Sequence, residues 1–136
     1  FSFFIINIFN IAFSKEEYFK KGLQLYKNKK YDDAKFMFEK SIVFNPKNSH
    51  SYLYLAKIFN YKEDQNNEEK NLNTTLLIEP ENEEAILMLM KISLEKSNYL
   101  KVKELSKKFS QVCKKLCNEN KKILENLDNI EPKNDS

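Results

Sequence analysis

The chain places its apolar residues at helical spacing, most clearly near the C-terminus. There Ile123, Leu124, Leu127 and Ile130 share one side of a helix, and Lys, Glu and Asn fill the opposite side. Only one Gly and three Pro interrupt the 136 residues, and Lys, Glu, Leu and Asn are frequent, which favours helices. We therefore predict helices over residues 16–28, 31–44, 50–61, 66–78, 83–96 and 99–113, followed by a last helix over residues 117–130.

The first fourteen residues, FSFFIINIFNIAFS, are uncharged and end abruptly at Lys15. This run has about the length of the hydrophobic region of a signal peptide and is too short to span a bilayer comfortably. Ala12 and Ser14 flank Phe13 with the spacing that a signal peptidase accepts, which predicts cleavage before Lys15. Two alternatives stay open: an uncleaved membrane anchor, or an apolar helix packed on the rest of the fold. No Cys follows the small residues, so a bacterial lipoprotein anchor is not expected.

Two stretches of the chain repeat nearly the same pattern. FEKSIVFNPKNS covers residues 38–49, LNTTLLIEPENE covers residues 72–83, and Pro46 and Pro80 stand 34 residues apart. Upstream of Pro46, aromatic and small residues occur at characteristic distances: Tyr18, Gly22, Ala34 and Phe38. The stretch EEYFKKGLQLYKNKKYDDAKFMFEKSIVFNPKN therefore resembles a tetratricopeptide repeat (TPR), a helix-turn-helix unit of 34 residues.

The resemblance to TPR proteins extends over most of the chain. A second copy has these residues in register: Tyr52, Leu55, Ala56, Phe59, Leu72 and Pro80. A third copy keeps the apolar register with Ile86, Leu89, Met90, Tyr99 and Val102. The resemblance implies an all-α fold, a right-handed α-solenoid of about three helix-turn-helix repeats plus a C-terminal capping helix. We expect a TPR domain over residues 15–131, with repeats over about 15–48, 49–82 and 83–116, a capping helix over 117–130 and a polar tail over 132–136.

Small residues allow the helices of such a repeat to approach each other closely. Gly22 and Ala56 have little or no side chain, so each lets its helix lie near the partner helix of the same repeat. The second helix of the middle repeat contains QNNEEKNLNTTL, which has few apolar residues, and Glu68 stands where a small residue is usual. Because its helix propensity is also poor, we expect this helix to fray or to have a loose inner face.

Cys113 and Cys117 bracket the one turn of the array that lacks its proline. In the repeat register Cys113 corresponds to Asn45 and Cys117 to Ser49, so we predict that a disulfide closes the turn KKL if the chain is exported. The alternatives are one unbroken helix with two free thiols, or two small buried side chains. Because His50 is the only histidine, we expect no metal site.

The charge of the chain argues against nucleic-acid binding. The 23 basic residues are all Lys, and the 20 acidic residues leave a net charge of only +3. Nucleic-acid-binding proteins usually concentrate positive charge and use Arg for bidentate contacts, so we interpret these charges as solvated helix faces. The sequence lacks a Gly-rich phosphate loop, a haem motif and an HExxH helix, and acidic pairs such as Glu83 and Glu84 fit helix N-termini. We therefore expect no catalytic site and no cofactor.

The resemblance also suggests where a partner would bind. In TPR proteins the first helices of successive repeats line a concave groove that receives a peptide or helix. By register, the candidates for this groove are Phe19, Leu23, Tyr26, Leu53, Lys57, Asn60, Leu87, Lys91 and Leu94. Each apolar candidate is equally consistent with ordinary packing, whereas Lys57 and Lys91 suggest a ligand with negative charge and an apolar anchor. Some TPR proteins grip a chaperone's C-terminal carboxylate with Lys and Asn where this chain has Phe19 and Leu23, so that activity is not expected.

These observations lead to one functional hypothesis and two alternatives. The hypothesis is a non-catalytic scaffold, exported to the bacterial periplasm, that binds a peptide or helix of a partner protein. If residues 1–14 are not cleaved, the chain is instead a membrane-tethered TPR subunit of an envelope assembly complex. An RNA-binding helical repeat is the third hypothesis, but its unit usually runs one residue longer, and the absence of Arg argues against it.

Overall fold

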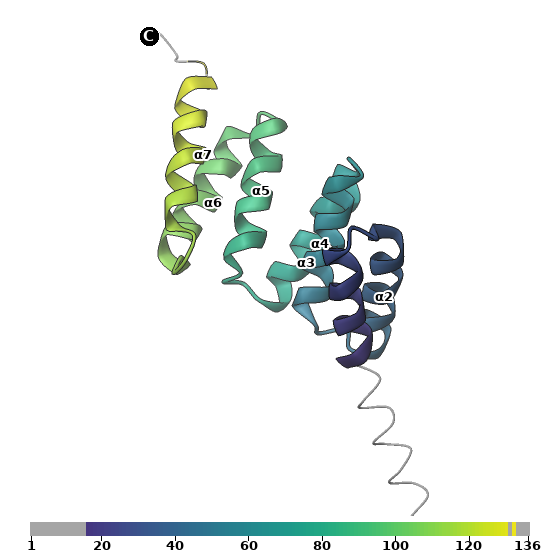
Figure 1. Ribbon diagram of the computed structural model, residues 1–136. Coiled ribbons are helices and arrows are strands. Elements are labelled where there is room, and N and C mark those ends of the chain that lie inside the picture. The colour runs from purple at the N-terminus through teal and green to yellow at the C-terminus, as the bar shows by residue number, and fades with distance from the viewer. Residues whose placement is uncertain (1–15, 131, 133–136) are drawn as a thin grey trace, which may run out of the picture. The chain divides into compact units, whose positions relative to one another are not determined.

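The structure, a computed structural model, describes residues 16–130 and 132. All secondary structure in these residues is α-helix, and turns connect the helices. A first helix covers residues 16–27, and it is followed by α2 (Tyr31–Phe44), α3 (Ser49–Tyr61), α4 (Gln65–Ile78), α5 (Glu83–Glu95), α6 (Tyr99–Val112) and α7 (Cys117–Ile130) (Figure 1). The all-α prediction is confirmed, and each helix begins and ends within one residue of its predicted bounds. The predicted signal or anchor segment, residues 1–14, and the polar tail except Pro132 lie outside the described residues.

The chain divides into two compact units, and the division falls within α4. Unit 1 extends to Thr74 and contains the first helix, α2, α3 and most of α4. Unit 2 begins at Thr75 and contains the end of α4 together with α5, α6 and α7. Each unit has its own hydrophobic core, so each is described separately below.

The core of unit 1 depends on a close approach at Gly22. Ala34 and Phe38 of α2 and Leu55 and Ile58 of α3 are buried in this core. A Cβ atom placed on Gly22 would lie only 2.7 Å from Cε1 and 2.9 Å from Cδ1 of the Phe38 ring. Gly22 therefore has the packing role predicted for it, because no side chain fits between the first helix and Phe38.

Backbone features recur at the interval of the sequence repeat. Lys29, Glu63 and Ser97 each end the first helix of a hairpin with a positive φ, of 59°, 58° and 55° respectively. Asn48 and Asn82 occupy the N-caps of α3 and α5, and their side chains accept hydrogen bonds from backbone N–H groups of the first turn. Both sets are spaced by 34 residues, so the local structure follows the period that the two prolines indicated.

The helix α4 differs from its predicted behaviour. It runs without interruption from Gln65 to Ile78, and Leu72 and Thr75 on its inner side are completely buried. Glu68 is also buried, and its carboxylate accepts a hydrogen bond of 3.1 Å from the side-chain amide of Asn60. The expectation of a loose inner face is therefore wrong, because this hydrogen bond satisfies a polar side chain where a small residue was expected.

The core of unit 2 joins α7 to the two helices before it. Ile123 and Leu127 of α7 are buried against a cluster that contains Met90 of α5 and Phe109 of α6. Figure 1 shows α7 alongside α5 and α6, and Ile130 at the end of α7 remains largely exposed. The predicted capping helix is therefore present and covers apolar side chains of α5 and α6.

Candidate functional site

Unit 1 carries a cluster of aromatic side chains on its first helix and α3. The ring of Phe19 lies edge-on to Tyr54 and to His50, with centroid distances of 6.2 Å in both cases, and Tyr26 meets Tyr54 edge-on at 5.0 Å. The ammonium group of Lys57 lies 4.6 Å from the centroid of the Tyr54 ring. We call these five residues the aromatic face.

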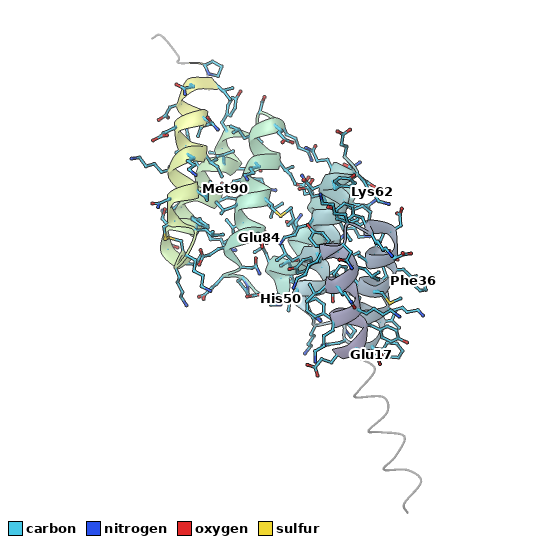
Figure 2. All side chains as sticks on the ribbon, in the orientation of Figure 1. Glu17, Phe36, His50, Lys62, Glu84 and Met90 are labelled. Atoms are coloured by element: carbon cyan, nitrogen blue, oxygen red, sulfur yellow. A yellow bond between two sulfur atoms is a disulfide. The ribbon has the colours of Figure 1, made fainter. Side chains whose placement is uncertain are left out.

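Helical spacing explains why these side chains lie together. His50, Tyr54 and Lys57 follow one another at intervals of four and three residues, so they project from the same side of α3. His50 is exposed, whereas Tyr54 and Lys57 are half-buried. Figure 2 labels His50 at the beginning of α3 and Phe36 on the neighbouring α2. Edge-on ring contacts of this kind are favourable, so the aromatic face is organised before any ligand arrives.

The structure divides the predicted groove residues of unit 1 into two groups. Phe19 and Tyr26 belong to the aromatic face, and the half-buried Leu23 packs against the same core. In contrast, Leu53 is only 4% exposed, so the packing interpretation holds for it. Asn60 is exposed, but its amide donates to Glu68.

The predicted groove residues of unit 2 form a separate set on α5. Leu87 is 6% exposed and belongs to the hydrophobic core, and Leu94 is half-buried against that core. Lys91 is exposed, and its positive charge contributes to lowering the pKa of Glu119, after the hydrogen bond and charge of Lys122. The charge of Lys91 therefore already acts on a carboxylate of the same unit.

Sequence reasoning missed three residues of this region: His50, Tyr54 and Tyr61. His50 was considered only as a metal ligand, and Tyr54 was passed over for its neighbour Leu53. Tyr61 is 66% exposed and continues the same side of α3, where its ring meets Tyr31 at 4.4 Å. The spacing of aromatic residues at 50, 54 and 61 was the available signal, because it places all three rings on one side of a helix.

The turn between α6 and α7 has two unusual features. First, Cys113 ends α6 in an extended conformation with φ −62° and ψ 140°, so the alternative of one unbroken helix is wrong. The Cα atoms of Cys113 and Cys117 are 5.4 Å apart and their sulfur atoms lie at bonding distance, which is the geometry of a disulfide.

The second feature is that the carboxylate of Glu83 accepts hydrogen bonds from three consecutive backbone N–H groups, those of Lys114, Lys115 and Leu116, at 2.7–3.2 Å. These bonds, that from Leu116 above all, hold the pKa of Glu83 below its usual value. Glu83 was predicted only to supply charge at a helix N-terminus, and its partners were not foreseen.

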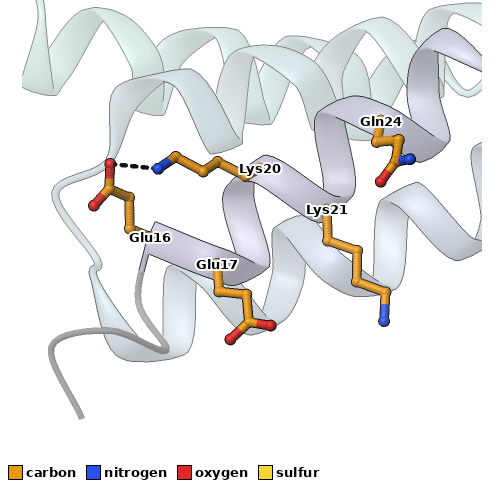
Figure 3. Close-up of a pocket in the computed structure, with 5 residues that line it drawn as sticks. All are labelled: Glu16, Glu17, Lys20, Lys21 and Gln24. Carbon is orange, nitrogen blue, oxygen red and sulfur yellow. Dashed lines mark ion pairs between the residues drawn. The ribbon is translucent and has the colours of Figure 1, made fainter. Parts of the chain in front are cut away.

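The remaining surface features of the described residues do not indicate a catalytic or metal-binding site. A hollow along the first helix is lined by Glu16, Glu17, Lys20, Lys21 and Gln24, and Glu16 and Lys20 form an exposed ion pair of 3.0 Å there (Figure 3). Among the described residues, no three His, Cys, Asp or Glu side chains gather in a way that would hold a metal ion. None of the helices in that part of the chain is long and apolar enough to cross a membrane.

Comparison with known proteins identifies the fold. No family model matches the sequence, and no curated protein sequence is significantly similar to it. Solved structures match well, and one is the TPR2B domain of yeast Sti1 in complex with pHsp70. It has a TM-score of 0.77 and 11% identity, and the match covers 86% of this chain and 98% of that domain.

Two further solved structures support the same conclusion. The Yersinia enterocolitica type III secretion chaperone SycD, in complex with a peptide of the translocator YopD, has a TM-score of 0.77 and 13% identity over 86% of this chain and 94% of its own. The first TPR of Spaghetti (RPAP3), bound to the HSP90 peptide SRMEEVD, has a TM-score of 0.71 and 17% identity over 85% and 94% of the two chains. The chain therefore has the TPR fold, which the sequence pattern predicted.

Proposed function

We propose that this chain is a non-catalytic interaction module that binds a peptide or helix of a partner protein on the aromatic face of unit 1. The observation that carries the proposal is the preorganised set of rings around Tyr54, with Lys57 above it. Three proteins of the same fold, Sti1, SycD and Spaghetti, were solved in complex with pHsp70, a translocator peptide and an HSP90 peptide. Those complexes support a protein-binding role by analogy of fold, and the argument for this chain rests on its own aromatic face.

The chemistry of the aromatic face suggests the character of the ligand. Rings at Phe19, Tyr26 and Tyr54 offer flat apolar surface with two rotatable bonds each, which suits an apolar or aromatic anchor. Lys57 adds positive charge, and the exposed imidazole of His50 adds a polar ring edge. We therefore propose a segment that combines an apolar anchor with an acidic residue.

We also propose that the chain is exported, that it is cleaved before Lys15, and that Cys113 and Cys117 form a disulfide in the periplasm. The uncharged segment at residues 1–14 and the distance between the two Cα atoms support this proposal. N-terminal sequencing of the native protein tests the cleavage. A mature chain that begins at Lys15 excludes the alternative of a membrane-tethered subunit of an envelope complex, whereas an intact first segment favours that alternative.

Charge reversal at the aromatic face tests the binding proposal, and a second reversal examines unit 2. We expect Lys57→Glu to reduce the amount of partner captured by the immobilised chain at least about tenfold, because a like charge replaces an attraction at the aromatic face. Lys47→Glu, an exposed change outside the aromatic face, serves as the matched control, and Lys91→Glu probes unit 2. Equal capture by wild type and Lys57→Glu, measured by quantitative mass spectrometry, would falsify the proposed site.

A further inference from the structure

The carboxylate of Glu83 ties together two distant parts of unit 2. Its Oε1 atom accepts from the backbone N–H groups of Lys114 at 2.7 Å and Lys115 at 3.2 Å. Its Oε2 atom accepts from Lys115 at 3.1 Å and from Leu116 at 2.7 Å. Because Glu83 is the first residue of α5, these bonds attach the beginning of α5 to the turn that leads into α7.

The three N–H groups converge because the turn is short and closed. Lys114, Lys115 and Leu116 lie between the end of α6 and the beginning of α7, outside both helices, so their N–H groups need an acceptor other than a helical carbonyl. Successive N–H groups in such a turn form a concave nest that suits an anion. Cys113 and Cys117 stand at the two ends of this turn, and a bond between them restricts how far the turn can open.

The turn leads directly into α7, which packs on the rest of unit 2. Ile123 and Leu127 of α7 are buried against a cluster that includes Met90 and Phe109. Displacement of α7 would expose these apolar side chains to water. Glu83 holds the turn that immediately precedes α7, so its hydrogen bonds help to keep α7 over this apolar surface.

We propose that the α6–α7 turn and Glu83 form a thiol-responsive latch, in which reduction of the Cys113–Cys117 disulfide releases the turn from Glu83 and loosens α7. The proposal rests on the disulfide proposed above. In the reaction the S–S bond breaks, and a dithiol reductant supplies two electrons and two protons. The products are the two cysteine thiols and the disulfide of the reductant. Without the bond the turn can extend, and the three N–H groups no longer converge on one carboxylate.

Trypsin provides a direct probe, because Lys114 and Lys115 lie inside the latched turn. We expect cleavage after these residues to be slow in the oxidised full chain and about tenfold faster after treatment with dithiothreitol, since proteolysis follows the population of the locally open form. The Glu83→Gln variant removes the charge but keeps the size of the side chain. In this variant, cleavage is already fast in the oxidised chain, and reduction adds much less than it adds to wild type.

Two controls make the test specific. Glu81→Gln changes an exposed carboxylate just before α5 and is expected to behave as wild type. The Cys113→Ser, Cys117→Ser double variant is expected to show the fast cleavage of the reduced chain with and without dithiothreitol. Circular dichroism at each condition verifies that the helix content is retained, so that faster cleavage reports local opening and not global unfolding.

The possible outcomes separate the latch from the other proposals. Equal cleavage of oxidised and reduced wild type, with the disulfide verified by peptide mapping, overturns the latch. Additive effects of reduction and Glu83→Gln overturn the coupling of Glu83 to the disulfide. Two free thiols in the native exported protein overturn the disulfide itself. None of these results depends on whether the aromatic face binds a partner, which the capture experiment measures independently.

Discussion

Three residues other than glycine have a positive φ in the described part of the chain, a conformation that costs conformational free energy. Lys29, Glu63 and Ser97 adopt a positive φ at the end of the first helix of each hairpin, a position where glycine is usually preferred. A residue with a side chain is strained in this conformation by roughly 1–2 kcal/mol. The chain has its single glycine elsewhere, at Gly22, so the turns lack the residue that would relieve this strain.

We predict that Ser97→Gly stabilises the chain. The substitution removes the steric cost of the positive φ, and the greater freedom of glycine in the unfolded chain offsets part of the gain, which leaves about 0.5–1 kcal/mol. The free energy of unfolding from urea titration is the measurement. The exposed change Lys107→Gly within α6 is the control, and it is expected to destabilise by about 1 kcal/mol. A loss of stability with Ser97→Gly would contradict the strain argument.

The stability that Glu83 contributes depends on pH. Because the pKa of Glu83 is lowered in the folded chain, its contribution to stability is present above the ordinary glutamate pKa and disappears as pH falls through the lowered folded value. Wild type should therefore be more stable than Glu83→Gln at pH 7, and the two should converge once the pH is below the lowered folded pKa of Glu83, where the carboxyl is protonated in both the folded and the unfolded chain. Urea titrations of both chains across this range test the expectation, and a constant difference would contradict it.

Whole helices depend on contacts that the residue pattern only partly reveals. The sequence of α4 is rich in Asn and Thr, which suggested a frayed helix. In the structure the helix is continuous, and its residues Leu72 and Thr75 are completely buried. Tertiary contacts outweigh weak propensity here, because burial of apolar surface exceeds the few tenths of a kcal/mol that separate most residues in helix propensity. Glu68 shows the same effect, since Asn60 supplies the hydrogen bond that its buried carboxylate requires.

The packing of the first helix against α2 allows almost no added volume. We predict that Gly22→Ala destabilises the chain by about 1–3 kcal/mol, because the new methyl group would overlap the ring of Phe38 and force both helices to shift. Gln24→Ala, an exposed change on the same helix, should alter stability by less than about 0.5 kcal/mol. Thermal unfolding of the two variants distinguishes these outcomes, and equal midpoints would show that the helices separate without cost.

The capping role of α7 leads to a matched pair of substitutions. Leu127 is fully buried in the core of unit 2, whereas Ile130, three residues further on, is 55% exposed. We predict that Leu127→Ala costs about 2–5 kcal/mol through lost burial and the cavity that remains, and that Ile130→Ala costs less than about 0.5 kcal/mol. Hydrogen exchange of the α7 amides should increase only in the first variant. Similar exchange in both variants would exclude a capping contact at Leu127.

The repeat pattern accounts for the fold of the molecule but does not identify its ligand. Chains with 11–17% identity to this one share its helical arrangement, so a small number of close-packed and turn positions suffices for the fold. The surface positions are not constrained in this way. Phe19 and Leu23 illustrate this, because they stand where the resemblance associates a polar pair with carboxylate binding. Instead, Phe19 belongs to the aromatic face and Leu23 packs against the core of unit 1.

Spacing along the chain was enough to predict the helices, their period, the close approach at Gly22 and the proximity of Cys113 and Cys117 at the last turn. These features depend on residues close together in the chain or related by the repeat interval, so spacing alone indicates them. The packing of the helices was needed to show that Leu53 and Leu87 are buried, that His50 and Tyr54 contact Phe19, and that Glu83 binds the α6–α7 turn. Each of these features depends on which groups of another helix or turn lie opposite. The partners of Glu83 are more than thirty residues away in the chain, and because they are backbone N–H groups, no residue type indicates them.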